Sequence, residues 1–239
     1  MQVIVTDAFW RLFPEARIGI IIARGIDNTA AAEEAAALLG AAGAAAARDL
    51  AGVDIASHPA VAPWRQAYAR FGAKPSKFRS SIESLLRSAQ AGRLRTINPL
   101  VDLYNAVSLR HQLPCGGEDL AAIAGDVHLT RAAGGESFRT IGAAQDDPPP
   151  AGEVIYADDA GAICRCFNWR ESDRTRLTSA TTDALLVIEA LPAHAPAQLD
   201  AALRELAHLV ATHLGGALRT AVLHRAQPAL AVDGAHGEA

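Results

Sequence analysis

Helical and strand patterns occupy different parts of this chain, and this separation limits the folds it can adopt. Helical periodicity dominates from residue 29 to about residue 109, and short strand-like runs dominate between residues 127 and 190. A doubly wound parallel sheet would instead need strands and helices that alternate along the chain. The order therefore predicts an α+β fold. We find no internal repeat and no linker long enough to divide the chain, so a single module over residues 1–239 is expected.

The expected elements follow from local spacing and from helix caps. The segments 3–5 and 18–23 are short, rich in β-branched residues and bounded by turn signals, which is typical of buried strands. Ser80 with Glu83 three residues later predicts a capped helix that ends at Gly92. Further helices are expected at 29–48 (broken near Gly40 and Gly43), 59–71 and 196–214. Further strands are expected at 127–131, 137–141, 153–157, 162–168 and 185–190, and a frayed tail at 228–239.

One helix carries a line of polar side chains on an otherwise apolar body. Asn98 is a good N-cap and Pro99 suits the first helical position. Asp102, Asn105 and Ser108 then recur every three residues. These three could line a pocket and orient a water molecule, or they could tie a buried helix to neighbouring loops through hydrogen bonds.

Composition sets the class of protein. Half of the 239 residues are hydrophobic and 20% are charged, which is ordinary for a soluble globular protein. Three cysteines are too few for a disulfide framework, and no apolar run reaches the length of a membrane span, so a cytoplasmic protein without membrane contact is expected. No phosphate-binding loop, dinucleotide-binding glycine motif or zinc motif is found, and we expect neither cofactor nor metal.

A basic segment stands out in this acidic chain. Residues 65–95 hold eight basic side chains and one acid, Glu83, so the segment carries +7 and the remainder of the chain carries −11. Such an island predicts a docking surface for a polyanion, with RNA as the first candidate. The alternative is an ordinary solvated helix face. The candidate RNA-binding residues are Lys74, Lys77, Arg79, Arg87, Arg93 and Arg95.

Several short stretches, in a fixed order, resemble a known family. The specific part is Ile97-Asn98-Pro99-Leu100-Val101-Asp102-Leu103-Tyr104-Asn105; the others are Lys74-Pro75-Ser76-Lys77, Glu83-Ser84-Leu85-Leu86-Arg87, Glu118-Asp119-Leu120, Gly134-Gly135-Glu136, Asn168-Trp169-Arg170-Glu171-Ser172 and Leu186-Val187-Ile188-Glu189. Together they resemble the B3/B4 module of the bacterial phenylalanyl-tRNA synthetase β subunit. The resemblance is closer still to free-standing proteins made of that module alone, and it is clearest over residues 60–190.

The resemblance implies a compact module with a β-sandwich-like core and packed helices. It also implies an editing activity, the hydrolysis of tRNA charged with the wrong amino acid, performed in trans. The 3′ acceptor end of tRNA would be the partner, and no obligate protein partner is expected. Glu171 matches the synthetase glutamate that recognises the phenol of tyrosine. Gly116 stands where the synthetase has a histidine, so the chain differs from the synthetase at that point.

Ester hydrolysis needs a pocket, donors for the carbonyl oxygen and an acceptor for water. Glycine lets the backbone approach a ligand closely. The candidate catalytic residues are Asn105, Asp102, Ser108, Gly116 and Gly117, and the candidate substrate-binding residues are Glu171, Gly135, Glu136, Asn168 and Trp169. Two alternatives stay open: an RNA-binding module without catalysis, and a binder of a free amino acid.

Overall fold

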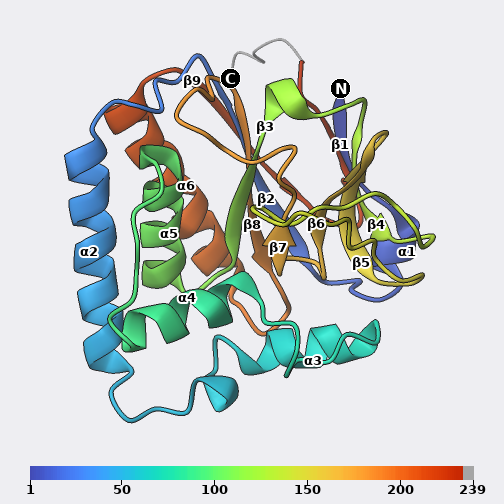
Figure 1. Cartoon of the computed structure of the whole chain (residues 1–239), viewed down its shortest axis with the longest axis horizontal. Helices are drawn as coiled ribbons and strands as arrows, with labels where there is room; N and C mark the ends of the chain where they lie inside the picture. Colours follow the sequence, from blue (N-terminus) through green and yellow to red (C-terminus); the bar gives the residue numbers. More distant parts are fainter. Residues whose placement is uncertain (234–239) are drawn as a thin grey trace.

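Two sheets and the helices packed on them make up the computed structural model, which describes residues 1–233 (Figure 1). The helices are α1 (Asp7–Trp10), α2 (Ala32–Asp49), α3 (Ala62–Arg70), α4 (Ser81–Gln90), α5 (Pro99–His111) and α6 (Pro196–Leu214). The strands are β1 (Gln2–Val5), β2 (Arg17–Arg24), β3 (Cys115–Asp119), β4 (Val127–Arg131), β5 (Val154–Asp158), β6 (Gly161–Arg165), β7 (Arg170–Glu171), β8 (Ala184–Ala190), β9 (Ala217–Leu223) and β10 (Ala229–Ala231). The fold is therefore α+β, as the sequence predicts.

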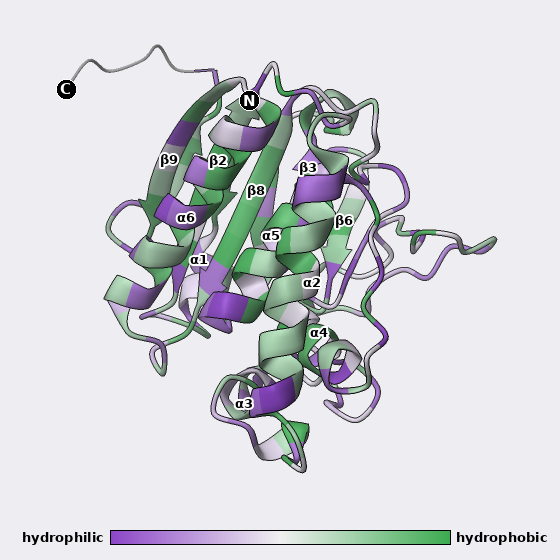
Figure 2. Ribbon diagram, turned by 90° about the vertical axis from the view of Figure 1, so that its left-hand side faces the viewer, coloured by the Kyte–Doolittle hydropathy of each residue, from purple (hydrophilic) through white to green (hydrophobic). Residues whose placement is uncertain are grey.

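The four-stranded sheet has the order β3-β8-β2-β9 and is antiparallel throughout. Both of its faces are covered. Adjacent residues on β2 show this, because Ile20 belongs to the core on one side and Ile21 to the core on the other. Helices α5 and α6 cover the Ile21 face, and α2 packs outside α5 (Figure 2). An apolar run without alternation is what a strand buried on both faces requires.

The six-stranded sheet has the order β10-β1-β4-β5-β6-β7. Its strands pair antiparallel except for β1 and β4, which run parallel. The side chains of Val3, Leu129 and Ile163 join Ile20 and Val187 of the other sheet in one apolar core. The two sheets thus enclose a sandwich-like core, and the far face of the four-stranded sheet carries α5 and α6.

Helix caps agree with the sequence-based expectation. The Ser80 hydroxyl accepts a hydrogen bond from the Glu83 backbone N–H at 3.3 Å, and the Asn98 side chain accepts one from the Val101 N–H at 3.1 Å. The Glu83 side chain takes no part in the cap and turns instead toward arginines. Helix α2 is continuous through both of its glycines. At Gly43 a Cβ atom would collide with the Leu94 side chain, so a glycine here lets the chain pack closely.

Several expectations were wrong, and the break expected near Gly40 and Gly43 is one of them, because α2 runs through both. Residues 137–141 form no strand, and only an isolated bridge joins Thr140 to Ser172. Gly116 and Gly117, for which no strand was expected, belong to β3. Strand β9 was not expected, and β10 lies inside the expected frayed tail, of which residues 234–239 fall outside the described part.

Among residues 1–233, no helix combines the length and the apolar character that a membrane span requires.

Candidate functional site

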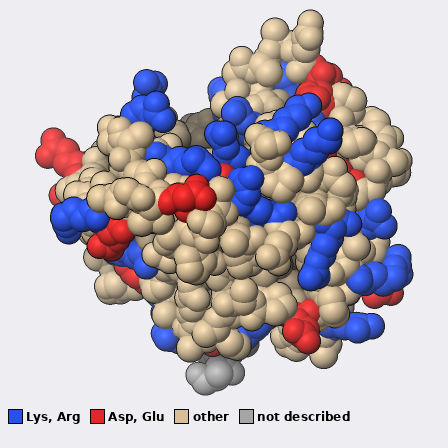
Figure 3. Space-filling view, turned by 90° about the horizontal axis from the view of Figure 1, so that it is seen from below, with Lys and Arg blue, Asp and Glu red and all other residues tan. Residues whose placement is uncertain are grey.

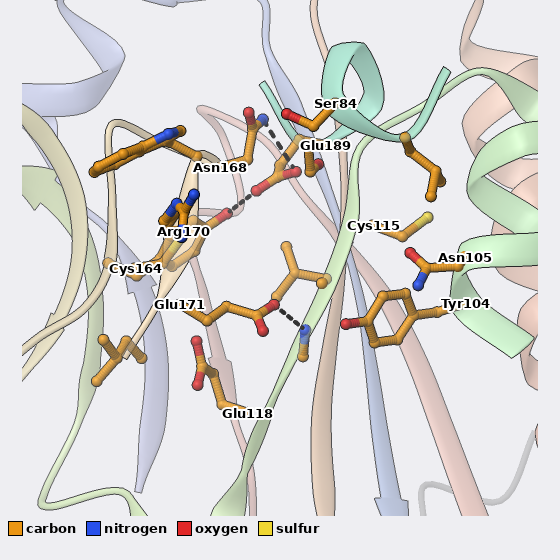
Figure 4. A pocket seen from close by; sticks show the side chains of 18 of the residues that line it. Ser84, Tyr104, Asn105, Cys115, Glu118, Cys164, Asn168, Arg170, Glu171 and Glu189 are labelled. Carbon is orange, nitrogen blue, oxygen red and sulfur yellow. Dashed lines mark hydrogen bonds between the residues drawn. The ribbon is translucent and has the colours of Figure 1, made fainter. Parts of the chain in front are cut away.

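A cavity of about 310 Å³ lies where the two sheets meet α4 and α5. Strands β3 and β8 form one wall, and β5, β6 and β7 form the opposite wall (Figure 4). Helix α4 borders it with Ser81, Ser84 and Ser88, and α5 contributes Tyr104 and Asn105. Much of the lining is apolar, and the volume suits a guest the size of one amino acid.

Three glutamates put carboxyl groups into this cavity, one from each of β3, β7 and β8. Glu189 of β8 is 4% exposed and accepts hydrogen bonds from the Tyr156 hydroxyl at 3.0 Å and the Asn168 amide at 3.4 Å. Burial raises the pKa of the Glu189 carboxyl to about 8, against an ordinary value of 4.5. At neutral pH this group is therefore largely protonated.

Glu171 reaches the cavity because the chain turns sharply after β6. Cys166 and Phe167 both adopt left-handed backbone conformations, with φ of 46° and 67°, and Phe167 is fully buried. The turn places Glu171 opposite Cys164 in the β6–β7 pair. The Glu171 Oε1 atom accepts a hydrogen bond from the Gly117 N–H at 3.2 Å. Burial raises the pKa of Glu171 to about 7, so the group ionises near neutral pH.

Glu118 of β3 is the third carboxyl and lies beside Glu171 (Figure 4). It is 5% exposed, and its Oε2 atom has no hydrogen-bond partner among the described residues. Burial raises the pKa of Glu118 well above its usual range, and the neighbouring Glu171 carboxyl raises it further. Two neighbouring carboxyl groups disfavour simultaneous ionisation, so the pair holds a proton more readily than either group alone.

The polar line on α5 divides. Asn105 lines the cavity. Asp102 points back to the start of the helix, where it accepts a hydrogen bond from the Ile97 N–H at 2.9 Å, and Ser108 donates to the Leu113 carbonyl at 2.6 Å. Neither Asp102 nor Ser108 lines the cavity, so both side chains tie the helix to its flanking loops.

The glycine motifs divide in the same way. Gly116 and Gly117 lie on β3 at the cavity, and the Gly117 N–H is already bonded to Glu171. Gly135 and Glu136 lie elsewhere, in an exposed turn where the Glu136 carboxylate accepts from the Ala133 and Gly134 N–H groups. Asn168 and Trp169 do line the cavity, and Trp169 packs edge-to-face on Phe78 with ring centroids 4.7 Å apart.

The basic segment also has two parts. Glu83, fully buried, binds Arg65 at 2.9 Å and Arg87 at 3.0 Å, and Arg79 lies 3.9 Å away. Lys74, Lys77, Arg93 and Arg95 are exposed. Figure 3 shows the side of the molecule that carries α3 and α4, where Lys and Arg side chains outnumber acidic ones. Because α4 also borders the cavity, the cavity opens beside a positive surface.

Sequence reasoning missed Glu189, Tyr104 and Tyr156 as cavity residues. A glutamate inside the apolar strand 185–190 was the available signal, since a lone buried carboxyl is uncommon in such a strand. Cys115 and Cys164 line the cavity too, but burial raises the pKa of both thiols well above the usual range. A neutral thiol is a poor nucleophile, which argues against cysteine chemistry.

The chain belongs to the B3/4 domain family, whose model matches residues 63–215. Among solved structures, it is similar to an N-terminal fragment of the phenylalanyl-tRNA synthetase β-subunit from Pyrococcus horikoshii, with 13% sequence identity and a TM-score of 0.45. That similarity covers 91% of this chain and 50% of the fragment, so the chain spans about half the length of the fragment. No curated protein matches the sequence.

Proposed function

We propose that this protein hydrolyses the ester bond of tRNA that carries a wrong amino acid, acting in trans. Its membership of the B3/4 domain family supports a task connected with tRNA. The observation that carries the proposal is the amino-acid-sized cavity, in which Glu171 and Asn105 lie at the same hollow beside a basic surface.

The chemistry asks little of the protein, because an aminoacyl ester is already reactive. Water adds to the acyl carbon, the bond to the ribose oxygen breaks, and that oxygen leaves with a proton. The Glu171 carboxyl contacts the aminoacyl group and takes the proton of the attacking water. Its pKa of about 7 gives it the proton affinity that a general base needs at neutral pH.

Asn105 and Gly117 have separate roles in this scheme. The Asn105 amide donates to the acyl carbonyl oxygen, where negative charge develops as water adds. The Gly117 N–H holds the Glu171 carboxyl in place through its 3.2 Å hydrogen bond, so it orients the base and is not free to bind the substrate.

The acceptor end of the tRNA lies along the exposed basic residues. Lys74, Lys77, Arg93 and Arg95 are available for phosphate oxygens, because they are exposed and have no ion pair among the described residues. Arg65 and Arg87 are both held by Glu83; the Arg65 pair joins α3 to α4, and the Arg87 pair lies within α4.

A panel of mischarged tRNAs tests the proposal. The protein should release amino acid from at least one of them. Glu171→Gln should slow the release by about 100-fold or more, the usual contribution of a general base. Asn105→Ala should slow it by about 100-fold or more, the usual contribution of a donor to the developing oxyanion. Glu34→Gln, which removes an exposed carboxylate on α2, is the matched control and should keep full activity. Binding of tRNA without turnover on any member of the panel would point to a non-catalytic RNA-binding module. Binding of a free amino acid with indifference to tRNA would point to a small-molecule binder.

A further inference from the structure

We propose that the cavity selects its guest by a primary ammonium group, which the Glu118 carboxylate accepts beside Glu171. That the guest is an aminoacyl group rests on the proposed function. That the guest is cationic rests on the cavity alone. It assigns Glu118 as the residue that determines specificity.

Glu118 is a buried acceptor with few donors: the Thr175 side chain lies close enough to favour the ionised carboxyl, but the Oε2 atom accepts no hydrogen bond from the described residues. Glu118 is 5% exposed and borders an open cavity. A polar atom taken from water without a hydrogen bond costs free energy, and a charged atom costs more. A guest that brings a donor to this atom removes that cost when it binds.

The other carboxyl groups differ from Glu118 in this respect. Glu189 already accepts from Tyr156 and Asn168, and Glu171 accepts from the Gly117 N–H. An incoming donor therefore finds its free acceptor at Glu118. The neighbouring Glu171, which takes the water proton in the proposed hydrolysis, adds negative charge beside Glu118 and so favours a cationic guest.

The protein supplies no cation of its own to this pair among the residues that the structure describes. Arg174 is held by Asp158, with hydrogen bonds of 2.7 Å and 2.9 Å. Arg170 also lines the cavity, but its side chain is exposed, its guanidinium lies 5.4 Å from the Trp169 ring, and it forms no ion pair with either carboxyl. Within residues 1–233 no cluster of His, Cys, Asp and Glu is arranged to hold a metal ion, so a metal does not fill the place either. Neither arginine pairs with Glu118 or Glu171, so a cationic guest can supply the missing counter-charge.

Binding should release protons. The groups that face the Glu118 and Glu171 carboxyls are Glu189 from β8, Tyr104 from α5, Tyr156 from β5 and Cys164 from β6, and beyond them lie the paired charges of Asp158 and Arg174. Their balance is acidic, so an empty cavity keeps carboxyl protons that a bound cation displaces. Affinity for a guest that stays cationic over this range, such as one with a lysine side-chain ammonium group, should therefore rise between about pH 6 and pH 8 as Glu171, with a pKa of about 7, ionises.

Four amides separate the two possible sources of the ammonium group. Lysine amide carries it on both the side chain and the α-carbon, norleucine amide only on the α-carbon, and Nα-acetyl-lysine amide only on the side chain. Nα-acetyl-norleucine amide carries none. Isothermal titration calorimetry with the intact protein measures each affinity at about pH 7.5, where Glu171 ionises readily, and the calorimetric buffer dependence reports the released protons.

We expect the guests that place an ammonium at the pair to bind at least about 10-fold more tightly than the uncharged amide, since a hydrogen bond to a charged group is among the stronger ones. The two singly charged amides show which ammonium is recognised. Glu118→Gln keeps the shape and removes the charge, so it should abolish the preference, whereas Glu34→Gln should leave it intact. Thermal melting checks that the Glu118→Gln protein is folded.

Equal affinity for charged and uncharged amides, or no binding of any of the four to the wild-type protein, would overturn the inference. So would a preference that survives in folded Glu118→Gln. The proposed hydrolysis fails separately, because it is measured on mischarged tRNA. Absence of that activity with an intact amine preference would reject the enzyme and keep the ammonium site.

Discussion

A Cβ atom at Gly116 would lie 2.8 Å from the Oε1 atom of Glu171. The absence of a side chain at position 116 leaves space for the Glu171 carboxyl. Glu171 can therefore lie against β3 and accept a hydrogen bond from the Gly117 N–H. The sequence resemblance places a histidine at this position in the synthetase.

Gly116→Ala should displace Glu171 and weaken its bond to Gly117. The added methyl lies closer to the carboxyl than ordinary packing allows, while the extended backbone of β3 accepts alanine without strain. We expect kcat/KM for deacylation to fall by about 10-fold or more, because a misplaced base loses its alignment with water. Gly40→Ala is the control, since nothing lies within 4 Å of a Cβ there, and it should keep full activity. Unchanged kcat/KM in Gly116→Ala would show that the position of Glu171 is unimportant.

Glu189 should make the protein less stable as the pH rises. Its pKa is about 8 in the folded protein and ordinarily 4.5, so below about pH 4.5 the group is protonated in both states and has no effect. Between these values the unfolded chain releases the proton and the folded protein keeps it, and the free energy of unfolding falls by up to about 1.4 kcal/mol per pH unit for this group. Glu118 and Glu171 act with the same sign, because burial raises the pKa of each.

Urea unfolding between about pH 5 and pH 8, the window in which the two states differ in protonation, measures this dependence. Glu189→Gln keeps an acceptor for the Tyr156 hydroxyl but cannot ionise. The variant should therefore lose less stability than the wild type over that range, and its advantage should grow with pH. Parallel pH curves for the two proteins would contradict the assignment.

The fold was predictable where period and caps agree. Clear end signals bound three such elements. The strand at 18–23 is visible as a continuous apolar run, the strand at 127–131 alternates, and the helix at 196–214 follows the helical period. Strand β9 carries only one buried residue among seven, so its apolar pattern is weak, and its place in the sheet comes from pairing with β2. Pairing of that kind depends on the whole fold.

The site was predictable only in part. A spacing of three residues, as in Asp102, Asn105 and Ser108, does not keep all three side chains on one face of a helix. Each residue turns the helix by about 100°, so Asp102 and Ser108 point about 120° apart. Only Asn105, between them, faces the cavity. Glu171 and Gly116 came from the family resemblance. Glu189 and the unpaired oxygen of Glu118 depend on which strands meet in space, and no local pattern contains that information.

The Glu83 cluster should be a stability element. Glu83 is fully buried and holds Arg65 and Arg87, which come from α3 and α4. Glu83→Gln leaves these guanidinium groups without their counter-charge, and removing one partner of a buried pair is costly. Because both arginines keep some access to water, we expect the free energy of unfolding to fall by about 2 kcal/mol, measured by urea unfolding. Arg87→Ala should cost less, since Arg65 still neutralises Glu83. A cost for Arg87→Ala equal to that of Glu83→Gln would contradict the shared role.

Lys74 and Lys77 should contribute to tRNA affinity without affecting the fold. Both side chains are exposed beside the α4 face that borders the cavity, and neither has an ion pair among the described residues. In the double variant Lys74→Glu/Lys77→Glu, tRNA binding should weaken by about 10-fold or more at low salt, because two phosphate partners become repulsive. The slope of log affinity against log salt should become shallower by about 1 for each phosphate that no longer has a cationic partner.

Filter binding over a salt series measures both the affinity and the slope, and thermal melting of the double variant should match that of the wild type. Arg204→Glu on α6 removes an exposed positive charge elsewhere and should leave affinity and slope close to wild type. The double variant changes the net charge by four and Arg204→Glu changes it by two. A weakening in Arg204→Glu half as large, on the logarithmic scale of affinity, would mean that net charge, and not the basic surface beside the cavity, governs binding.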